Sequence, residues 1–482
     1  MITVNKPTYE SPLCSRYASE RMQYIFSPDY KFTTWHRLWL ALAENEHALG
    51  LNVTAEQVDE LRANLDMIDY EAADRYEREL RHDVMAHIRA WGDHCPKARG
   101  IIHLGATSCY VDDNGDLIAY RDALRQIRML LVNAIAAIAD FAEKNADTPV
   151  LAYTHYQAAQ PTTVGKRACM WAQDLMLDLE RLDFELERIP FYGCKGATGT
   201  GASFLALFGG DAARAEELEA RIARDMGFER ALPICGQTYT RKLDYYFLSV
   251  LSGIAQSASK MATDLRLMAH EKEFDEPFTA SQVGSSAMAY KRNPMRCERI
   301  CSLARYVLCD TLNPAITSSV QWLERTLDDS ANRRISIPEA FLATDAILNL
   351  VINVMSGCTV YPGMMERHLR EELPFLATEN ILMRAVELGG DRQELHEVIR
   401  EYSVDTARRM KETGCANDLE EKLLADERFR LTRETLSELL DIRKFIGMAP
   451  KQARDFVNNS IKPMLEANAA ELGADGKGEV KC

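Results

Sequence analysis

One stretch of twelve residues concentrates groups that could abstract a proton or hold an anion. Residues 284–295, GSSAMAYKRNPM, combine a flexible start with two serine hydroxyls and two cations. Two chemistries fit this combination. Ser285 or Ser286 could be a nucleophile with Lys291 as its base, as in a Ser-Lys hydrolase. Alternatively, the loop could close over an anionic substrate, with its cations neutralising carboxylates while a serine oxyanion removes a proton.

The basic residues in and after this loop favour an anionic ligand over a solvated surface turn. Four of them, Lys291, Arg292, Arg296 and Arg299, lie within nine residues of a chain whose formal net charge is −15, and Arg325, Arg333 and Arg334 follow. Such groups bind carboxylate and phosphate through charge-assisted hydrogen bonds. An ion pair with Asp328 or Asp329 is the alternative for Arg333.

Three further stretches place histidines or hydroxyls among polar neighbours. They are RHDVMAH with Arg81, His82, Asp83 and His87, HLGATSCYVDDN with Thr107 and Ser108, and THYQAAQPTT with Thr154 and His155. Polar neighbours can orient an imidazole ring and tune its pKa near neutrality, so His82 and His155 are candidates for proton transfer. A hydrogen-bonded structural role is the alternative for each ring.

A metal site is not expected from the histidine spacing. His82, His87, His94, Cys95 and His103 fall within 22 residues. His82 and His87 are five apart, whereas two ligands on one helical face need a separation of three or four.

Helices must position nearly all of these groups. Apolar residues recur at helical spacing in 31–50, and longer periodic segments cover 117–146, 162–189, 238–272, 296–325 and 336–357. Gly50 is a typical helix end, and Thr54 with Gln57 predicts a capping box. Segment 336–357 is apolar on more than one face, which predicts burial inside a bundle or between subunits.

Length and composition predict a globular, all-α protein of three helical domains. The chain has 482 residues, of which 47% are apolar and 27% charged, so it is neither disordered nor fibrous. We expect an N-terminal helical domain over 1–107, a central long-helix bundle over 108–360, and a C-terminal domain of shorter, more charged helices over 361–482.

Charge and cysteine usage restrict the partners and the compartment. The acidic balance argues against nucleic-acid binding, which requires a basic face. Twelve cysteines without CxxC pairs fit reduced thiols. No long apolar segment predicts a membrane span, and the N-terminus has no signal pattern. We therefore expect a cytoplasmic protein with no nucleic-acid or membrane partner.

Six motifs in order resemble the fumarase/aspartase superfamily and, within it, the adenylosuccinate lyase family of animal type. GSSAMAYKRNPM resembles the signature loop of the superfamily, and the narrower resemblance rests on RHDVMAH, HLGATSCYV, THYQAAQPTTVGKR, GQTYTRK and ERTLDDSANRR. The similarity runs from SRYAS at 15–19 to ELPFLATENI at 372–381. It implies a fumarase/aspartase-like fold, a signature loop over 280–295, and neither a metal nor an organic cofactor.

The activity implied by the resemblance is release of fumarate from a succinyl-nucleotide. The substrates would be adenylosuccinate, giving AMP, and SAICAR, the succinylated aminoimidazole carboxamide ribotide, giving AICAR. Removing a proton beside a carboxylate creates a dianion that needs positive charge and hydrogen-bond donors. The resemblance makes Ser285 the base, His155 the general acid and Lys291 a stabilising cation, while His82 would orient or charge-balance the site.

The resemblance also implies a set of substrate-binding residues. Arg16 and Tyr17 would lie near the nucleotide, and Arg325, Ser330 and Arg334 near its phosphate. The succinyl carboxylates would contact Thr107, Ser108, Lys291 and Asn293, with Gln237 at the same end, and Arg81, Asp83, Thr154 and Arg299 complete the set. Because the motifs lie over two hundred residues apart, each site would draw on three chains of a homotetramer, in which the central helices form a common bundle.

Two positions depart from the family pattern without removing a chemical group. Ala289 stands where the family usually has proline, which should raise the entropy lost when the loop closes. Gly201 stands where glutamine is expected, near a helix start. The alternatives to this lyase are a non-catalytic relative and another lyase of the superfamily with a different leaving group.

Overall fold

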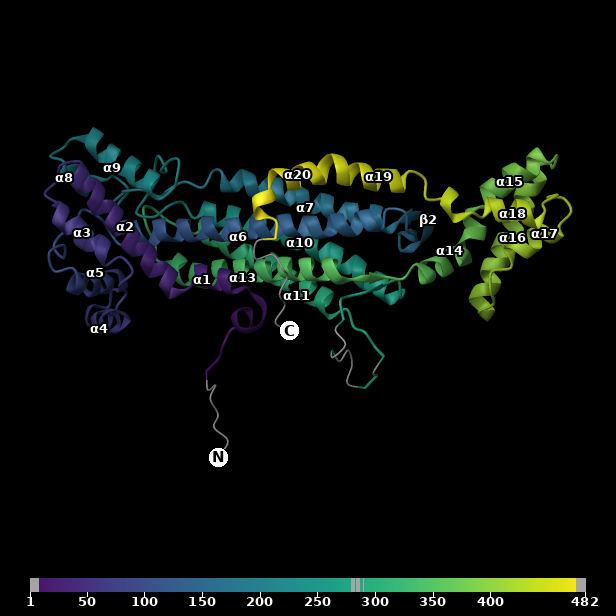
Figure 1. Ribbon diagram of the computed structural model, residues 1–482, viewed down its shortest axis with the longest axis horizontal. Helices are drawn as coiled ribbons and strands as arrows, with labels where there is room; N and C mark the ends of the chain where they lie inside the picture. The colour runs from purple at the N-terminus through teal and green to yellow at the C-terminus, as the bar shows by residue number, and fades with distance from the viewer. Residues whose placement is uncertain (1–7, 279–281, 283–286, 289, 474–482) are drawn as a thin grey trace, which may run out of the picture.

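A computed structural model describes residues 8–278, 282, 287, 288 and 290–473 of the chain. The molecule is elongated, with long helices running side by side through its middle and a group of shorter helices at each end (Figure 1). The described part is overwhelmingly helical, which confirms the all-α prediction.

The first end group precedes the long helices in the chain. The chain starts with a short π-helix η1 (Leu13–Tyr17) and α1 (Glu20–Ile25), which pack on α13, and the end group follows with α2 (Pro28–Ala48), α3 (Ala55–Ala63), α4 (Tyr70–Leu80) and α5 (Asp83–His94). The predicted capping box is confirmed, because Thr54 accepts from Gln57 N and the Gln57 side chain accepts from Thr54 N. Gly50, at φ +78°, follows the end of α2.

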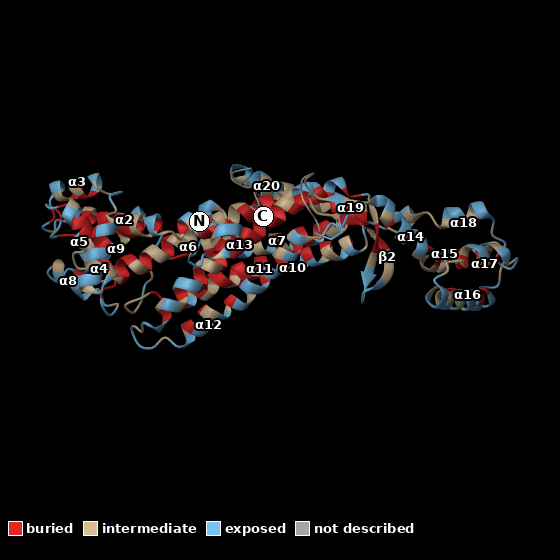
Figure 2. Ribbon diagram, turned by 90° about the horizontal axis from the view of Figure 1, so that it is seen from below, coloured by how far each residue is buried: buried red, intermediate tan, exposed pale blue. Residues whose placement is uncertain are grey.

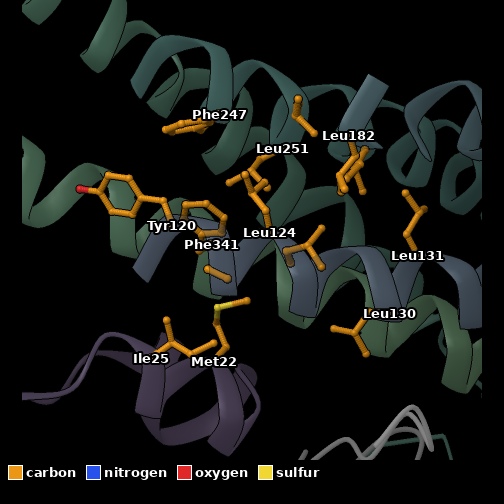
Figure 3. Packing of buried hydrophobic residues seen from close by; sticks show 14 of the residues in the cluster. Met22, Ile25, Tyr120, Leu124, Leu130, Leu131, Leu182, Phe247, Leu251 and Phe341 are labelled. Atoms are coloured by element: carbon orange, nitrogen blue, oxygen red, sulfur yellow. The ribbon is translucent and has the colours of Figure 1, made fainter. Parts of the chain in front are cut away.

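The central part contains the longest helices. Its elements are α6 (Cys109–Lys144), β1 (Pro149–Thr154), β2 (Gln157–Thr163), α7 (Val164–Leu186), α10 (Lys242–His270), β3 (Phe274–Asp275), α11 (Met295–Asp310), α12 (Leu312–Ser319) and α13 (Asp328–Gly357). Between α7 and α10 the chain returns to the first end group, where α8 (Ala202–Leu207) and α9 (Ala212–Asp225) lie beside α2. Helix α6 packs on α7 and α13, and α10 packs on α7, α11 and α13. Figure 3 shows Leu124, Leu251 and Phe341 from three of these helices in one core.

Helix α13 is the predicted multi-faced apolar helix, and it starts earlier than the sequence pattern indicated. Its apolar window has the length and composition of a membrane span, but 83% of that window is buried inside the molecule, as in the central helix of a bundle. Its first two turns, Asp328–Ile335, are polar and were missed for that reason.

The prediction of one helix over 296–325 is wrong, because this segment forms α11, α12 and a loop. Pro314 has no N–H to donate to the carbonyl of Asp310, and its ring clashes with that carbonyl in a continuous helix. Helix α11 therefore ends at Asp310, and residues 320–327 leave the helical path.

The hairpin of β1 and β2 was not predicted. The strands are antiparallel, with Thr154 opposite Gln157. The two turn residues, His155 and Tyr156, have φ of +52° and +58°. Such turns usually contain Asn or Gly, so the sequence carried no hairpin signal here. The hairpin protrudes sideways from the bundle (Figure 2).

The C-terminal part begins with β4 (Thr359–Val360), which pairs with β3. It continues through α14 (Pro362–Leu376), α15 (Thr378–Glu387), α16 (Arg392–Thr413), α17 (Leu419–Ala425), α18 (Arg433–Leu439), the short 3₁₀ helix η2 (Ile442–Lys444), α19 (Ala449–Phe456), the π-helix η3 (Val457–Ile461), α20 (Lys462–Ala467) and η4 (Ala469–Glu471).

The hydrophobic core is divided in the same way. Buried residues between Ala377 and Leu436 form a cluster separate from the main one, whereas α19 and η3 return to the bundle and contribute Ala453, Val457 and Ile461 to its core. The domain limits at 108 and 360 remain a prediction. All eleven cysteines in the described part of the chain are free thiols.

Candidate active site

A cavity of about 900 Å³ opens where α2, α5, α6 and α13 meet. Nine of the predicted site residues line it: Arg81, His82, Asp83, Thr107, Ser108, Gln237, Arg325, Ser330 and Arg334. They come from four of the motifs recognised in the sequence. The fold thus brings together segments separated by more than two hundred residues.

His82 connects two of these segments. Its Nδ1 accepts from the backbone N–H of Met85 at 3.3 Å, which makes His82 the N-cap of α5. In a neutral ring the hydrogen then lies on Nε2, which is 3.2 Å from Ser108 Oγ. With His82 donating to the Ser108 oxygen, the Ser108 hydroxyl hydrogen can be donated to a ligand.

Three helices, α5, α6 and α13, begin at the cavity wall. Asp83 is the first residue of α5, and Ser108 is the N-cap of α6 but makes no side-chain capping bond. Helix N-termini carry partial positive charge and unsatisfied N–H groups, which attract anions. The backbone therefore adds to the positive potential supplied by the arginines.

Arg325, Ser330 and Arg334 lie together around the start of α13. Arg334 is exposed and lies 3.8 Å from Asp83, so its guanidinium remains accessible to an anionic ligand. Gln237 is held beside Arg325 because its N–H donates to the Glu324 carbonyl at 2.9 Å. Gly236 is required for this approach, since a Cβ would lie 2.5 Å from the same carbonyl oxygen.

A buried ion-pair network supports the cavity wall. Arg241, from the GQTYTRK motif, pairs with Asp113 at 3.2 Å and with Asp329 at 2.6 Å, and all three side chains are at most 2% exposed. Removing one partner from such a network leaves an uncompensated buried charge, at a cost of about 3–5 kcal/mol. Arg241 therefore fixes α6 to the start of α13.

Arg333 belongs to the same support and not to the ligand-binding set. It pairs with Asp244 at 2.7 Å and with Asp116 at 3.0 Å. The alternative that it pairs with Asp328 or Asp329 is wrong, because its position in the helix points it toward α6 and α10.

Two cavity residues, Lys31 and Asp112, were missed from the sequence. Lys31 Nζ lies over the Trp35 ring at 4.6 Å, so its ammonium is held against the wall by a cation–π contact. Burial raises the pKa of the Asp112 carboxyl to about 7, and Lys31 opposes that rise. Lys31 sits among apolar residues at helical spacing, which gave no signal for a site.

The general-acid candidate lies elsewhere on the same chain. Thr154 and His155 are on the β1–β2 hairpin, which is at the opposite end of the long helices from α5 (Figure 1). Neither residue lines the cavity.

The signature loop is a third location. Ser285, Ser286 and Ala289 lie outside the described residues. Lys291 is exposed, and Asn293 precedes α11. Helix α11 is capped from outside, because the Glu276 carboxylate accepts from the N–H groups of Arg296 and Cys297 at 2.9 and 2.6 Å.

Arg16, Tyr17 and Arg299 gather beside this third location. The Arg299 guanidinium lies over the Tyr17 ring at 5.3 Å, joining α11 to η1. The chain thus holds its predicted site residues in three separate places: the cavity, the hairpin tip and the signature-loop region.

The clustered histidines have separate structural partners. His87 stacks on Phe32 with ring centroids 3.7 Å apart, His94 lies 3.1 Å from Asp69, and His103 accepts from Trp39 at 2.8 Å. Within the described ranges, no three histidine, cysteine or acidic residues are arranged to hold a metal ion.

Comparison with known proteins gives a full-length match. A family described as "Lyase" matches residues 40–309, and one described as "Adenylosuccinate lyase C-terminus" matches 374–456. The adenylosuccinate lyase of Saccharomyces cerevisiae is 51% identical, covering 94% of this chain and 96% of that protein, and that of Schistosoma mansoni is 45% identical, with 95% and 96% covered.

Solved structures show the same fold. A fumarate lyase from Mesorhizobium sp. BNC1 matches with a TM-score of 0.77 at 23% identity, covering 94% of this chain and 100% of that chain. The β-carboxy-cis,cis-muconate cycloisomerase from Acinetobacter calcoaceticus sp. ADP1 matches with a TM-score of 0.79 at 20% identity, covering 93% and 100%. The expected fumarase/aspartase-like fold is confirmed.

Proposed function

The chain belongs to the adenylosuccinate lyase family, and we propose on that premise that it eliminates fumarate from adenylosuccinate, giving AMP, and from SAICAR, giving AICAR. The observation that supports this best is that nine residues from four motifs line one cavity. Their side chains include hydrogen-bond donors and cations that can bind phosphate and carboxylate groups. Those donors suit a ligand with anionic groups at both ends.

The cavity would bind the nucleotide by its two charged ends. Arg325, Ser330 and Arg334 surround the start of α13 and suit a phosphate, which accepts several charge-assisted hydrogen bonds. Thr107 and Ser108 suit a succinyl carboxylate, with the Ser108 hydroxyl oriented by His82.

Proton transfer would use groups from the other two locations. Ser285 would remove the proton beside the succinyl carboxylate, and Lys291 with Asn293 would stabilise the dianion that results. His155 would then protonate the departing nitrogen, so that AMP leaves without negative charge at that atom. These roles follow the family resemblance, and His155 lies at the turn of a hairpin that protrudes from the bundle, where it can reach another subunit.

The separation of the three locations supports a homotetramer with shared sites. One chain cannot place the hairpin tip in its own cavity, because the two lie at opposite ends of the long helices (Figure 1). Exposed apolar side chains such as Leu312, Ile316 and Leu327 on and after α12 offer surface for packing against other chains. Free thiols throughout the described chain support a reducing, cytoplasmic site of action.

The deciding experiment measures fumarate release from adenylosuccinate by the wild type and by Ser285→Ala, with AMP checked as co-product. We expect turnover by the wild type and loss of most of the rate in the variant, while substrate still binds. A Ser-Lys hydrolase would instead show an acyl-enzyme burst and release no fumarate. A wild type that binds adenylosuccinate without turnover would indicate a non-catalytic relative, and turnover of another fumarate-releasing substrate alone would indicate a different lyase.

A further inference from the structure

The base of the β1–β2 hairpin contains an irregularity with a specific partner. The pairing register shifts between Val150 and Ala152, so Leu151 faces two residues of β2, Gln160 and Pro161, at a bulge. A bulge leaves backbone groups outside the ladder. The Leu151 carbonyl accepts from Arg167 Nη2 at 2.9 Å, and Arg167 lies in the first turn of α7, just after the hairpin.

Arg167 is part of a charged group that reaches the C-terminal part of the chain. Together with Glu271 and Glu273 it lines a second cavity, of about 310 Å³, whose wall also includes Tyr153 and Tyr156 of the hairpin. The Glu273 side chain is 1% exposed, and its carboxylate lies 2.9 Å from His368 Nδ1 on α14. Glu271 lies 3.9 Å from the other nitrogen of His368.

Backbone contacts also connect the hairpin, β3 and α14. The Tyr361 N–H donates to the Glu273 carbonyl at 2.9 Å, which joins the start of α14 to the strand β3. Helix α14 also packs on both strands of the hairpin. The hairpin is therefore packed against α7 and α14, whereas its tip extends outward, with Tyr156 63% exposed.

We propose that Arg167, Glu273 and His368 form a positioning network that holds the hairpin, and therefore His155, at the correct place in the site of a neighbouring subunit. This inference rests on the proposed function. His155 and Tyr156 both adopt left-handed backbone conformations, which non-glycine residues hold only when surrounding structure enforces them. Tyr156 at the tip lines the same cavity as Arg167 and Glu273, so these two residues lie where they can constrain the turn.

The chemistry of the network suits this role. A guanidinium has a rigid planar fork, so its bond to the Leu151 carbonyl fixes direction as well as distance. Burial lowers the pKa of the Arg167 guanidinium, and the negative charge of Glu273 across the cavity opposes that change. His368 on α14 contacts the Glu273 carboxylate from the other side. Misplacing a catalytic group by about 1 Å can reduce the rate roughly 100-fold.

The test compares Arg167→Met with Arg181→Met. Arg181 is on the same helix but half-exposed, and its ion pair with Glu185 is away from the hairpin. We expect Arg167→Met to lower kcat for adenylosuccinate at least tenfold with KM within twofold of wild type, because the nucleotide contacts lie on other elements. Arg181→Met should match the wild type, and Arg167→Lys should recover part of kcat. Unchanged kcat in folded Arg167→Met would overturn the proposal.

Mixing experiments distinguish positioning from general damage. Arg167→Met denatured and renatured together with Arg334→Met should regain activity, since the two changes affect different parts of a shared site. Arg167→Met mixed with His155→Gln should regain none, because both changes affect the hairpin. Recovery with His155→Gln would contradict the proposal.

A further variant covers the case in which Arg167→Met does not fold. His368→Asn changes a partly exposed residue on α14, and we expect a kcat three- to tenfold lower with KM unchanged. A wild-type kcat in this variant would then overturn the network. Failure of the proposed function can be distinguished from failure of the positioning network. If the proposed function is wrong, the wild type and Arg181→Met will release no fumarate at all.

Discussion

Single residues in this molecule carry charges whose ionisation affects binding and stability. The cavity holds anions, yet Asp112 lines it with its carboxyl facing Lys31, Asp83, Asp113 and Asp116. Outside the cavity, Glu46 on α2 is fully buried, and neither of its oxygens has a hydrogen-bond partner within the described chain. Burial raises the pKa of both carboxyls. We expect the first to affect substrate binding and the second to affect stability.

Asp112 should make substrate binding weaken as the pH rises. Its pKa of about 7 means that it is neutral in acid and anionic above neutrality, and an added negative charge in the cavity opposes an anionic substrate by about 1 kcal/mol, roughly fivefold in KM. We expect KM for adenylosuccinate to rise between pH 6 and 8 in the wild type and to change less in Asp112→Asn. Asp66→Asn, outside the cavity, is the control, and an identical KM profile in both variants would contradict the assignment.

Glu46 should destabilise the fold in alkaline solution. Burial raises its pKa to about 8, above its unfolded value of 4.5. The raised pKa of Glu46 contributes to the free energy of unfolding in full below pH 4.5. This contribution declines as the pH rises to 8, because the Glu46 carboxyl loses its proton at lower pH in the unfolded chain than in the folded one. Between these two pH values the free energy of unfolding should fall by up to about 1.4 kcal/mol per pH unit.

Thermal unfolding at pH 6 and pH 8.5 measures this effect. The unfolding temperature of Glu46→Gln should fall less between the two pH values than that of the wild type. Glu44→Gln, a half-buried position on the same helix, should behave like the wild type. Equal pH sensitivity of all three proteins would show that Glu46 does not carry the effect.

Among the elements, the long helices were predictable and their polar ends were not. The apolar period predicts α6, α7, α10 and α13 because each of them buries an apolar face in one bundle. The polar start of α13 has no such period, although it holds Ser330 and Arg334, and the same is true of Ser108, the N-cap of α6. The hairpin was missed because its turn has no glycine or asparagine. The break before Pro314 was missed because the apolar spacing on both sides of this proline is helical.

Site residues could be predicted where they belong to a recognisable motif. They could not be predicted where only the packing of helices brings them to the cavity. The cavity collects nine motif residues, whereas Lys31 enters it only through the approach of α2 to α6. Asp112 stood within the stretch HLGATSCYVDDN, but nothing in the sequence distinguished it from its neighbour Asp113, which forms a buried ion pair with Arg241. Gly201 is explained by its backbone, at φ +66° as the N-cap of α8, a conformation that favours glycine. The effect of Ala289 stays a prediction, and Ala289→Pro should raise kcat or lower KM.

The capping box of α3 gives a test at the scale of one element. Thr54→Ala removes the hydroxyl that accepts from Gln57 N, and loss of such a cap typically costs about 1 kcal/mol. We expect a lower unfolding temperature in Thr54→Ala and nearly the wild-type value in Thr54→Ser, which keeps the hydroxyl. Equal values for all three proteins would mean that α3 is held by packing alone.

At the scale of the whole molecule, the shared-site proposal predicts recovery from inactive parts. His155→Gln and Arg334→Met should each be nearly inactive alone, while tetramers that contain both chains should include intact sites. Light scattering should give about four chains per particle, and mixed samples should release fumarate. A monomer with full activity would contradict the arrangement.

The division of the core has a consequence for how the protein melts. The cluster between Ala377 and Leu436 shares no buried side chains with the bundle, and α14 connects the two, contributing Met365 to the bundle core while Phe375 packs on the other. Separate cores can behave as separate cooperative units. A calorimetric scan should therefore show two heat-absorption peaks, and hydrogen exchange should open the amides of α15–α18 before those of α6 and α13.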